Sequence, residues 1–598
     1  MIASSSVDVH HISSHSSIAL VTLIVAYIIF EVAFFFHYHY HVLPSANRIR
    51  SSQPPAPYRD YRNIDDRAKL LHRILDRLRN RLPATYQSVN DEKEASAKLV
   101  YSFIESWFIK KSHDDMYEKF SHQFDEATFD MGFCPPPPLM VRMAWSSAGS
   151  SVSIRDGSKN QSSSESLETL EYEANKPDMH QNASKKLSPS AENLGKLQKK
   201  NMNEFLSWAF FGIHYSTIQS TPEMNQVLEQ FYAILKNQAG LTFEEGKNIN
   251  FVPRCFTFEK VNSLYRPYGV YASVQLMRFS ANCVLYALGF RRFNCERGLR
   301  YWHRPATKQL SHSSNGKRPV QNQLSPFFFF HGIAPGGHAP YLPMIFLGIL
   351  RNHFQQRDIF FFENKPISYA LCMDALSEED TVHGVIEAIN RHLNKASANR
   401  LTLCGHSFGS CQLTWIVKSP QLRDILESLI LLDPVSILLS EPDVMINFLY
   451  TRPESNEESY TCSNTLLGKF IRFLNETKIH LVASSELFIE HYLRRNFAWY
   501  NSELWLEDIP PNVKVLVCLA DQDEIVNCKK IEREILQHNR LVAEASKNGT
   551  FPAGPRIELL LWKDVGHAHC VSNPERWREI RDAIDELDCY WSKNVHVR

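Results

Sequence analysis

The hydrophobic residues of this chain fall into a few patterns, and the first is a long apolar run near the N-terminus. Ile18 to Phe36 reads IALVTLIVAYIIFEVAFFF and contains one charged residue, Glu31. As a helix this run rises about 28 Å, close to the thickness of the hydrocarbon core of a bilayer. A charge such as Glu31 is tolerated near the membrane interface and costly at mid-bilayer. The pattern predicts a short tail over residues 1–17 and a transmembrane helix over residues 18–36.

The residues on either side of this run predict its orientation. No Lys or Arg precedes it, whereas Arg48, Arg50, Arg59 and Arg62 follow it, after a collar at His37 to His41 (HYHYH). By the positive-inside rule the C-terminal bulk of a single-pass protein would lie in the cytosol. A cleaved signal peptide is the alternative, but it requires a positively charged segment before a shorter apolar run.

Residues 45–145 are predicted to form a linker and a helical N-terminal region. Ser51 to Tyr58 (SSQPPAPY) is typical of a linker, and apolar residues recur at helical spacing over Asn63 to Leu82 and Ala95 to Ile109. Residues 146–200 are rich in Ser, Asn, Lys and Glu, so they bury too little apolar surface to fold. We expect this insertion to be a disordered spacer, with phosphorylation of its serines as an alternative role.

Helical periodicity resumes over residues 201–296, which we predict to be a helical region that packs on the domain after it. The periodicity is clear over Asn203 to Ile213 and over Tyr265 to Phe290. Arg278 and Asn282 lie in the middle of the second stretch, which argues against a second membrane span. We expect this stretch to pack on the following domain or to lie in the membrane surface.

From residue 297 to residue 598 short apolar runs alternate with helical stretches such as Glu378 to Leu393 and Phe408 to Lys418. Near-continuous apolar strands that alternate with helices predict a buried, mostly parallel sheet with helices on both faces. The predicted strands are Leu299–Trp302, Pro326–Phe330, Asp358–Phe362, Leu401–Cys404, Leu429–Leu432, Val513–Leu519 and Ile557–Leu561.

Composition narrows the classes of function. The chain has 598 residues, enough for several domains, and its 65 Lys and Arg balance 65 Asp and Glu, so charge does not favour a nucleic-acid partner. The 12 Cys are scattered singly without a CxxC pair, which argues against a zinc site or a disulfide framework. We therefore expect neither nucleic acid nor metal.

The strongest chemical signal is Gly405-His406-Ser407-Phe408-Gly409, a G-x-S-x-G motif between a predicted strand and a predicted helix. In that context a sharp turn presents the serine hydroxyl at a helix N-terminus, and the glycines let strand and helix approach closely. Ser407 is the predicted nucleophile. A structural turn without catalysis is the alternative.

The order of motifs over residues 297–591 resembles the α/β-hydrolase superfamily. Several strings, such as HGIAPGGHAPYLP from His331 and LLDPVSILLSEPDVMINFLY from Leu431, resemble a largely uncharacterised eukaryotic family of membrane-anchored α/β-hydrolases. The resemblance implies an α/β-hydrolase fold with a helical cap, serine chemistry, and no metal or organic cofactor. It does not imply a substrate.

In this superfamily the base follows the last strand, which implies His567 in Gly566-His567, with His569 as the rival. The implied acid is Asp523, because A-D-Q-D-E-I-V resembles the superfamily's G-x-x-D-x-I-V turn with Ala520 in place of Gly. Asp433 is the alternative, since Leu431-Leu432-Asp433-Pro434 resembles the place from which some lipases take their acid, and Asp521 is a minor one.

The oxyanion that forms when a serine attacks a carbonyl requires two backbone donors. The resemblance implies the amide of Phe408, directly after the nucleophile, and that of Ile333, in the His331-Gly332-Ile333 loop. A Gly-rich turn is the plain interpretation of that loop and is compatible with the first.

Residues 436–510 are long for one connection and rich in aromatic residues, so we expect a cap there. An apolar cap would exclude water and bind an acyl chain, although its aromatic residues can equally form its own core. The resulting hypothesis is a membrane-anchored serine esterase that acts on a lipid-like ester in the bilayer. The alternatives are acyl transfer or thioester hydrolysis by the same residues, and a non-catalytic membrane scaffold.

Overall fold

We describe a computed structural model of the chain, which covers residues 9–48, 64–82, 89–110, 197–307, 324–394, 399–451, 479–551 and 553–594. Two of the predicted segments, the linker at 51–58 and the Ser-rich insertion up to residue 196, lie outside the described residues. So do residues 452–478 of the predicted cap.

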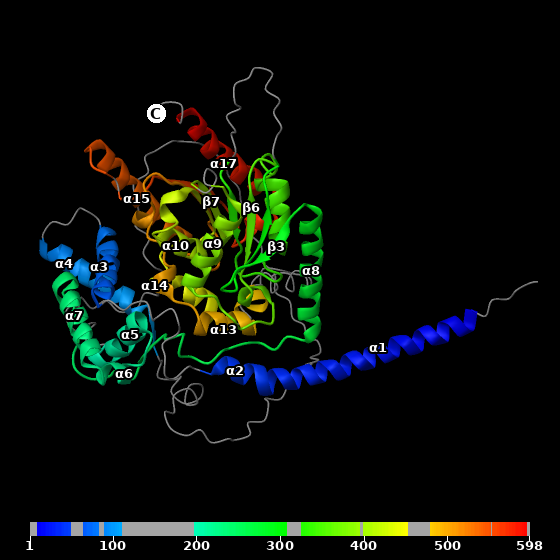
Figure 1. Ribbon diagram of the computed structural model, residues 1–598. Helices are drawn as coiled ribbons and strands as arrows, with labels where there is room; N and C mark the ends of the chain where they lie inside the picture. Colours follow the sequence, from blue (N-terminus) through cyan, green and yellow to red (C-terminus); the bar gives the residue numbers. More distant parts are fainter. Residues whose placement is uncertain are drawn as a thin grey trace, which may run out of the picture. The chain divides into compact units, whose positions relative to one another are not determined.

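An eight-stranded sheet forms the centre of the part of the chain that the structure describes (Figure 1). Its strand order is β10-β9-β8-β7-β5-β6-β4-β3, and β4 is antiparallel to both of its neighbours while β5 to β10 pair in parallel. The central strands are buried along their whole length, as expected for parallel strands covered on both faces. The strands are β3 (Arg291–Asn294), β4 (Arg300–Arg304), β5 (Phe327–Phe330), β6 (Ile359–Glu363), β7 (Leu401–His406), β8 (Leu426–Leu432), β9 (Lys514–Ala520) and β10 (Ile557–Trp562).

Seven of these strands coincide with predicted apolar runs, whereas β3 does not. Its residues, RRFN, are partly exposed at the edge of the sheet, so no apolar run marks them. The sheet therefore begins at Arg291, inside the range predicted to be only helical. A second difference concerns α5, which begins at Lys199 within the range predicted to be disordered.

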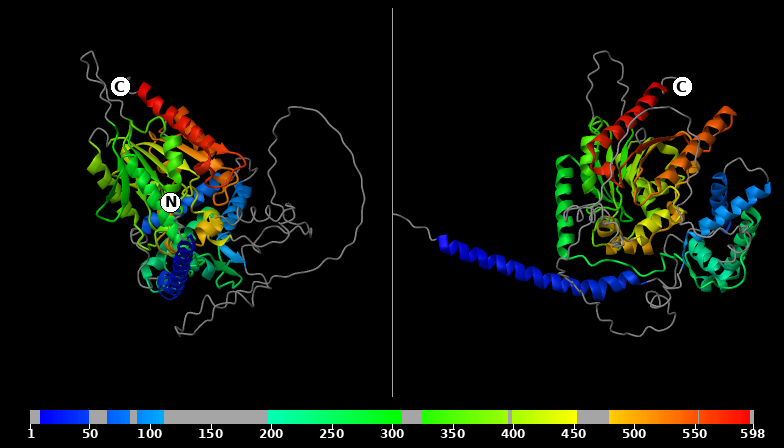
Figure 2. Two further views of the ribbon diagram at one scale, coloured as in Figure 1. Left: turned by 90° about the vertical axis from the view of Figure 1, so that its right-hand side faces the viewer. Right: turned by 180° about the vertical axis from the view of Figure 1, so that it is seen from behind.

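Helices cover both faces of the sheet (Figures 1 and 2). On one face, α8 (Tyr268–Ala287) and α17 (Pro574–Asn594) pack into a single core with β5, β6, β8 and β9. On the other, α10 (Gly409–Lys418) contacts β7 and α9 (Glu378–His392). The remaining helices of this domain are η4 (Ala339–Tyr341), η5 (Met344–Ile349), η6 (Pro366–Ser368), η7 (Arg423–Ile425), α15 (Cys528–Lys547) and α16 (His569–Ser572).

The segment between β8 and β9, predicted to be the cap, contains short helices with buried aromatic side chains. Tyr492 and Phe497 pack on Phe408, with ring centroids 5.5 and 5.6 Å from its ring. The described helices of this segment are α11 (Asp443–Met445), η8 (Ile446–Tyr450), η10 (His480–Ser484), α13 (Leu487–Arg495), α14 (Trp499–Ser502) and η11 (Leu506–Asp508).

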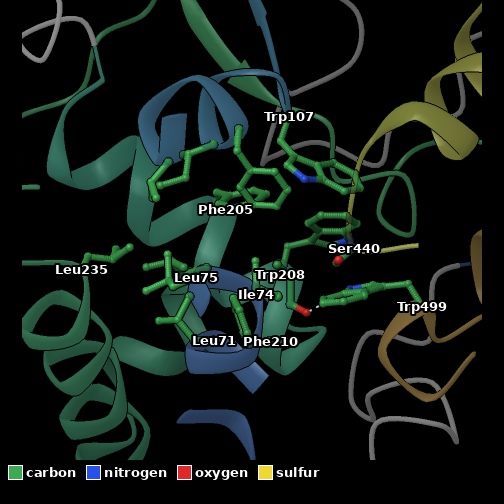
Figure 3. Close-up of a pocket in the computed structure, with 15 residues that line it drawn as sticks. Leu71, Ile74, Leu75, Trp107, Phe205, Trp208, Phe210, Leu235, Ser440 and Trp499 are labelled. Atoms are coloured by element: carbon green, nitrogen blue, oxygen red, sulfur yellow. Dashed lines mark hydrogen bonds between the residues drawn. The ribbon is translucent and has the colours of Figure 1, made fainter. Parts of the chain in front are cut away.

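An N-terminal group of helices packs together beside this segment and encloses an apolar cavity (Figure 3). Aromatic side chains such as Trp107, Phe205 and Trp499 line the cavity, and its lining includes none of the residues predicted for the active site. The elements are α3 (Ile64–Asn80), α4 (Val89–Glu105), β1 (Phe108–Lys110), α5 (Lys199–Phe211), α6 (Tyr215–Gln219), α7 (Pro222–Ala239) and β2 (Phe251–Pro253).

The apolar N-terminal run is helical. α1 (Val9–His37) continues through η1 (Tyr38–Val42) into α2 (Leu43–Asn47), and residues 22–47 form a helix long and apolar enough to cross a membrane. A signal sequence passes the same test. Glu31, the single charge in the run, lies at the N-terminus of α8: its carboxylate accepts hydrogen bonds from the Tyr268 backbone N–H, at 3.0 and 3.2 Å, and from the Tyr265 hydroxyl, at 2.5 Å. A carboxylate at a helix N-terminus is favourable.

A row of arginines on α3 attaches the N-terminal helices to the rest of the chain. The Arg77 guanidinium is 2.6 Å from the Glu503 carboxylate, and its carbon lies 3.6 Å from the centroid of the Trp505 ring. Glu503 is fully buried and the side chain of Arg77 is only 9% exposed. Arg73, one turn earlier, pairs with Glu507 and Asp508 but is 34% exposed.

This difference in burial predicts different costs for the two arginines. Arg77→Ala leaves the buried Glu503 carboxylate without its cation, so we expect a loss of about 3 kcal/mol in the free energy of unfolding. Arg73→Ala removes a more exposed pair and should cost about 1 kcal/mol or less. Chemical denaturation of the detergent-solubilised full chain measures both, and equal losses would contradict the assignment.

Candidate active site

Ser407 lies at the sharp turn between β7 and α10. Its φ is +51°, a left-handed conformation that side chains other than glycine rarely adopt. A Cβ at Gly409 would overlap the Phe330 carbonyl, and one at Gly405 would lie 2.8 Å from a Leu413 methyl group. The two glycines thus allow strand and helix to meet at this turn, and the turn exposes the serine hydroxyl to the groups described next.

His567 approaches Ser407 from the loop between β10 and α16. Its Nε2 is 2.8 Å from Ser407 Oγ. Its backbone N–H donates to Glu524 Oε2 at 2.8 Å, and a Cβ on Gly566 would lie 2.8 Å from the same carboxylate. The Glu524 carboxylate therefore lies close against the backbone of the Gly566-His567 pair and helps to fix the loop. His569 lies at the start of α16, and no hydrogen bond joins it to Ser407.

Asp523, in the loop after β9, holds the other side of the imidazole. Its Oδ2 accepts a hydrogen bond from His567 Nδ1 at 2.6 Å, while Oδ1 accepts from the Ile525 and Val526 backbone N–H groups, both at 2.8 Å. Since Nδ1 carries a proton toward the carboxylate, neutral His567 presents a lone pair at Nε2 to the Ser407 hydroxyl. The structure thus joins Ser407, His567 and Asp523 in one chain of hydrogen bonds.

Asp433, the alternative acid, lies nearby but has different partners. Its oxygens accept from the backbone N–H groups of Ala520 and Ala568, both at 3.1 Å. Burial alone would raise the pKa of Asp433, but the His406 and His567 imidazoles hold that pKa below its usual value. Asp433 is thus a buried anion that fixes the ends of β9 and the His567 loop. The side chain of Asp521, the minor alternative, makes no hydrogen bond to His567 within the described part of the chain.

The two predicted oxyanion donors lie on either side of Ser407. A Cβ on Gly332 would lie 2.9 Å from Ser407 Cβ, so the His331–Ile333 loop contacts the serine directly. Among the described residues, no protein acceptor is assigned to the amides of Phe408 or Ile333. Both N–H groups therefore remain for another acceptor beside the hydroxyl.

His331 fixes the direction of the Ile333 amide. Its Nδ1–H donates to the Gly332 carbonyl at 2.7 Å, and its Nε2 accepts from the Asn364 backbone N–H at 3.1 Å. Burial lowers the pKa of His331 to about 4, so it keeps this neutral tautomer. Because the C=O and N–H of a trans peptide point in opposite directions, a carbonyl held toward His331 turns the Ile333 N–H the other way.

Sequence reasoning missed a second set of polar residues behind the serine. Tyr341 accepts a hydrogen bond from the Gly332 N–H at 3.1 Å and donates to His406 Nδ1 at 2.9 Å. These side chains are fully buried. The only sequence signal was their place within the two motifs, because Tyr341 lies in the His331 string and His406 precedes the serine.

Two groups of described residues could in principle hold a metal ion. One is His406, Asp433 and Cys570, and the other contains Asp433, Asp523 and His567. In both groups the Asp433 oxygens face backbone N–H donors, whose partial positive charge would repel a cation. Burial also raises the pKa of the Cys570 thiol well above its usual value, so the thiol stays protonated. The donor set fits hydrogen bonding better than metal binding.

Three features define the architecture. The sheet is mostly parallel, and Ser407 lies at the turn after β7, which is the fifth strand of this sheet along the chain. His567, which contacts Ser407, and Asp523, which contacts His567, lie on the loops after the last two strands, β10 and β9. The chain has an α/β-hydrolase fold. This confirms the predicted fold class. No protein-family model matches the chain, and no curated protein matches it.

Solved α/β-hydrolase structures do match it. They include a thermophilic esterase from Thermogutta terrifontis (12% identity, TM-score 0.32, covering 50% of this chain and 99% of that one) and the carboxylesterase CesB from Bacillus subtilis (10%, 0.28, 53% and 99%). An α/β-hydrolase fold protein from Chitinophaga pinensis is similar at 14% identity (0.29, 50% and 96%).

The charges around His567 predict the pH dependence of Ser407 reactivity. Burial lowers the pKa of His567, but the charge and hydrogen bond of Asp523, with the charges of Asp433 and Glu524, outweigh it and raise that pKa to about 9. Only neutral His567 can accept the serine proton, so the rate of phosphonylation of Ser407 should rise with pH through a midpoint near 9. Labelling rates over pH 6 to 10 measure this, and a midpoint below about 7, the ordinary range of histidine, would contradict it.

Proposed function

We propose that this chain is a serine hydrolase that cleaves carboxylic esters through an acyl-enzyme. The observation that carries the proposal is the chain of hydrogen bonds from Ser407 through His567 to Asp523, with Ser407 at a strained turn. A serine hydroxyl is a weak nucleophile until a base removes its proton, and this arrangement supplies the base and its orienting acid.

The reaction proceeds in two halves. Ser407 Oγ attacks the ester carbonyl while His567 Nε2 takes the hydroxyl proton, and the tetrahedral intermediate expels the alcohol, which receives that proton. Water then attacks the acyl-serine, His567 takes a proton from the water, and the carboxylic acid leaves with Ser407 restored. Asp523 stabilises the imidazolium in both halves, and the Phe408 and Ile333 amides stabilise the oxyanion.

We further propose that α1 anchors the protein in a membrane, with the catalytic domain in the cytosol, and that the substrate is lipid-like. The contacts of Glu31 with Tyr265 and Tyr268 support an anchor that is retained, because cleavage of α1 as a signal peptide would remove these hydrogen bonds from the folded domain. The aromatic side chains that pack on Phe408 support an apolar acyl group beside the nucleophile.

Modification of Ser407 by a fluorophosphonate probe tests the hydrolase proposal. Incubation of the membrane-bound full chain, followed by peptide mass spectrometry, should place the adduct on Ser407, and Ser407→Ala should abolish it. Cys411→Ser, a substitution one helical turn away at a buried position, serves as the control for folding. A folded protein that the probe does not label would contradict the catalytic proposal and favour the non-catalytic scaffold.

The two buried acids should differ in what their loss changes. Asp523→Asn removes the anion that orients His567, so we expect kcat for ester hydrolysis to fall on the order of 10⁴-fold. Asp433→Asn places an amide NH₂ against the N–H of Ala520 or Ala568 and should instead cost roughly 1–3 kcal/mol of stability. Ester kinetics and thermal unfolding of both variants separate the roles, and the reverse pattern would assign Asp433 as the acid.

A further inference from the structure

The surface of α8 is unlike that of the other long helices of the domain. Its exposed apolar side chains include Leu276 (66% exposed), Phe279 (65%), Val284 (48%) and Tyr286 (50%). These residues, together with Cys283, are spaced so that they share one side of the helix, which we call the outer face of α8.

α8 also differs from the other long helices of the domain in its number of charged residues. The only charged residue among the 20 of α8 is Arg278, which turns inward, 3.7 Å from the Glu363 carboxylate. α15 also has 20 residues and lies on the surface of the same domain, but eight of them are charged: Lys529, Lys530, Glu532, Arg533, Glu534, Arg540, Glu544 and Lys547. The outer face also carries Ser273 and Ser280, whose hydroxyls donate to carbonyls of the same helix, but it carries no charged residue. A surface helix with an exposed apolar patch of this kind marks a contact with an apolar partner outside the fold.

α1 identifies the partner. The first turn of α8 contacts the C-terminal third of the apolar run: the Phe30 and Tyr268 rings lie 4.7 Å apart, and both Glu31 oxygens accept from the Tyr268 N–H. The apolar side chains of α1 before this point are exposed, for example Leu23 at 69% and Ile28 at 54%. An anchor that spans the bilayer through these residues therefore brings the start of α8 to the membrane.

The helices α1 and α8 run in different directions. In Figure 1 α8 is the helix on the side of the domain from which α1 leaves, and it runs crosswise to α1; the reverse view in Figure 2 agrees. A bilayer crossed by α1 would thus lie along α8. We propose that the outer face of α8 docks on the bilayer surface and lies in the plane of the membrane, as amphipathic interfacial helices do. This inference rests on the proposed membrane anchor.

Such docking would place the oxyanion loop next to the membrane. One edge of α8 packs on the loop that follows His331, because a Cβ on Gly336 would overlap the end of the Met277 side chain. Gln275 on α8 also donates to the Tyr369 carbonyl at 2.9 Å, and the Gly336 N–H donates to the neighbouring Ser368 carbonyl. The active site would therefore meet lipid esters at the surface in which they reside.

The native Cys283 provides the probe. The full chain, with the other non-buried cysteines replaced by serine, is labelled at Cys283 with an environment-sensitive fluorophore and placed in phosphatidylcholine nanodiscs that contain spin-labelled lipid. Interfacial helices bury their apolar face about 5–10 Å deep, so we expect on the order of half of the emission to be quenched by a spin label at that depth. Leu541→Cys on α15, in a Cys283→Ser background, is the matched control and should not be quenched. Val25→Cys reports the anchor in the same way.

The outcomes separate the two proposals. Quenching at Val25→Cys without quenching at Cys283 would overturn the docking of α8 and leave the anchor intact. Quenching at neither overturns both, while Ser407 labelling still reports the catalytic proposal. A blue-shifted Cys283 probe that lipid does not quench would mean that a second protein copy covers the face, which also overturns docking.

A charge substitution supplies the second arm of the experiment. Leu276→Asp with Phe279→Asp should abolish the quenching of Cys283 and leave Ser407 phosphonylation in detergent unchanged, because both side chains point away from the fold. Leu536→Asp with Leu541→Asp, at positions of α15 that are also more than half exposed, should leave the quenching of Cys283 unchanged. Persistent quenching in the α8 variant would overturn the proposal.

Discussion

The active site depends on one close approach of backbone to backbone, at the point where β5, β7 and α10 meet. Gly409 can approach the Phe330 carbonyl only because it has no side chain, and the turn that results holds Ser407 at a positive φ. The same approach brings the loop after β5 against Ser407, since Gly332 leaves no room for a Cβ there. One packing constraint thus sets both the candidate nucleophile and the loop that carries a candidate oxyanion donor. The strain at Ser407 is stabilised by the buried strands on either side of it.

A second constraint positions His567. His567 lies on a loop, and loops do not hold a side chain to a fraction of an ångström unless something fixes them. Here Asp433 binds the Ala568 N–H and Glu524 binds the His567 N–H, so carboxylates from two different strand ends fix the backbone on both sides of the imidazole. Asp433 also binds Ala520 at the end of β9, whose loop carries Asp523. The loops that carry Asp523 and His567 are therefore both fixed by the same buried anion, Asp433.

The sequence predicted the parts of this structure in which periodicity or a motif is local. The buried strands and the Ser407 turn were readable because a parallel sheet requires apolar runs and the turn requires glycine at fixed spacing. The edge strand β3 was not readable, since an exposed strand carries no such run. The partner of His567 was left between Asp523 and Asp433, because both follow strands and only the relative position of two loops decides which carboxylate reaches Nδ1. The hydrogen-bond partners of Glu31, Tyr265 and Tyr268, lie at least 234 residues away in the sequence, so no local pattern could indicate them.

Buried groups join the segment between β8 and β9 to α8 and to the residues just before it. The Tyr271 hydroxyl on α8 donates to the Glu486 carboxylate, the N-cap of α13, at 2.8 Å, and Arg266 donates to the Ser485 carbonyl at 2.7 Å. Burial raises the pKa of Glu486 to about 7. Because an unfolded glutamate titrates near 4.5, the stability that this buried carboxyl contributes is present at acid pH and is lost as the pH rises through 7. α13 carries Tyr492, which packs on Phe408 beside the nucleophile. A displacement of α8 would therefore reach Phe408, next to Ser407, through two side-chain contacts, that of Tyr271 with Glu486 and that of Tyr492 with Phe408.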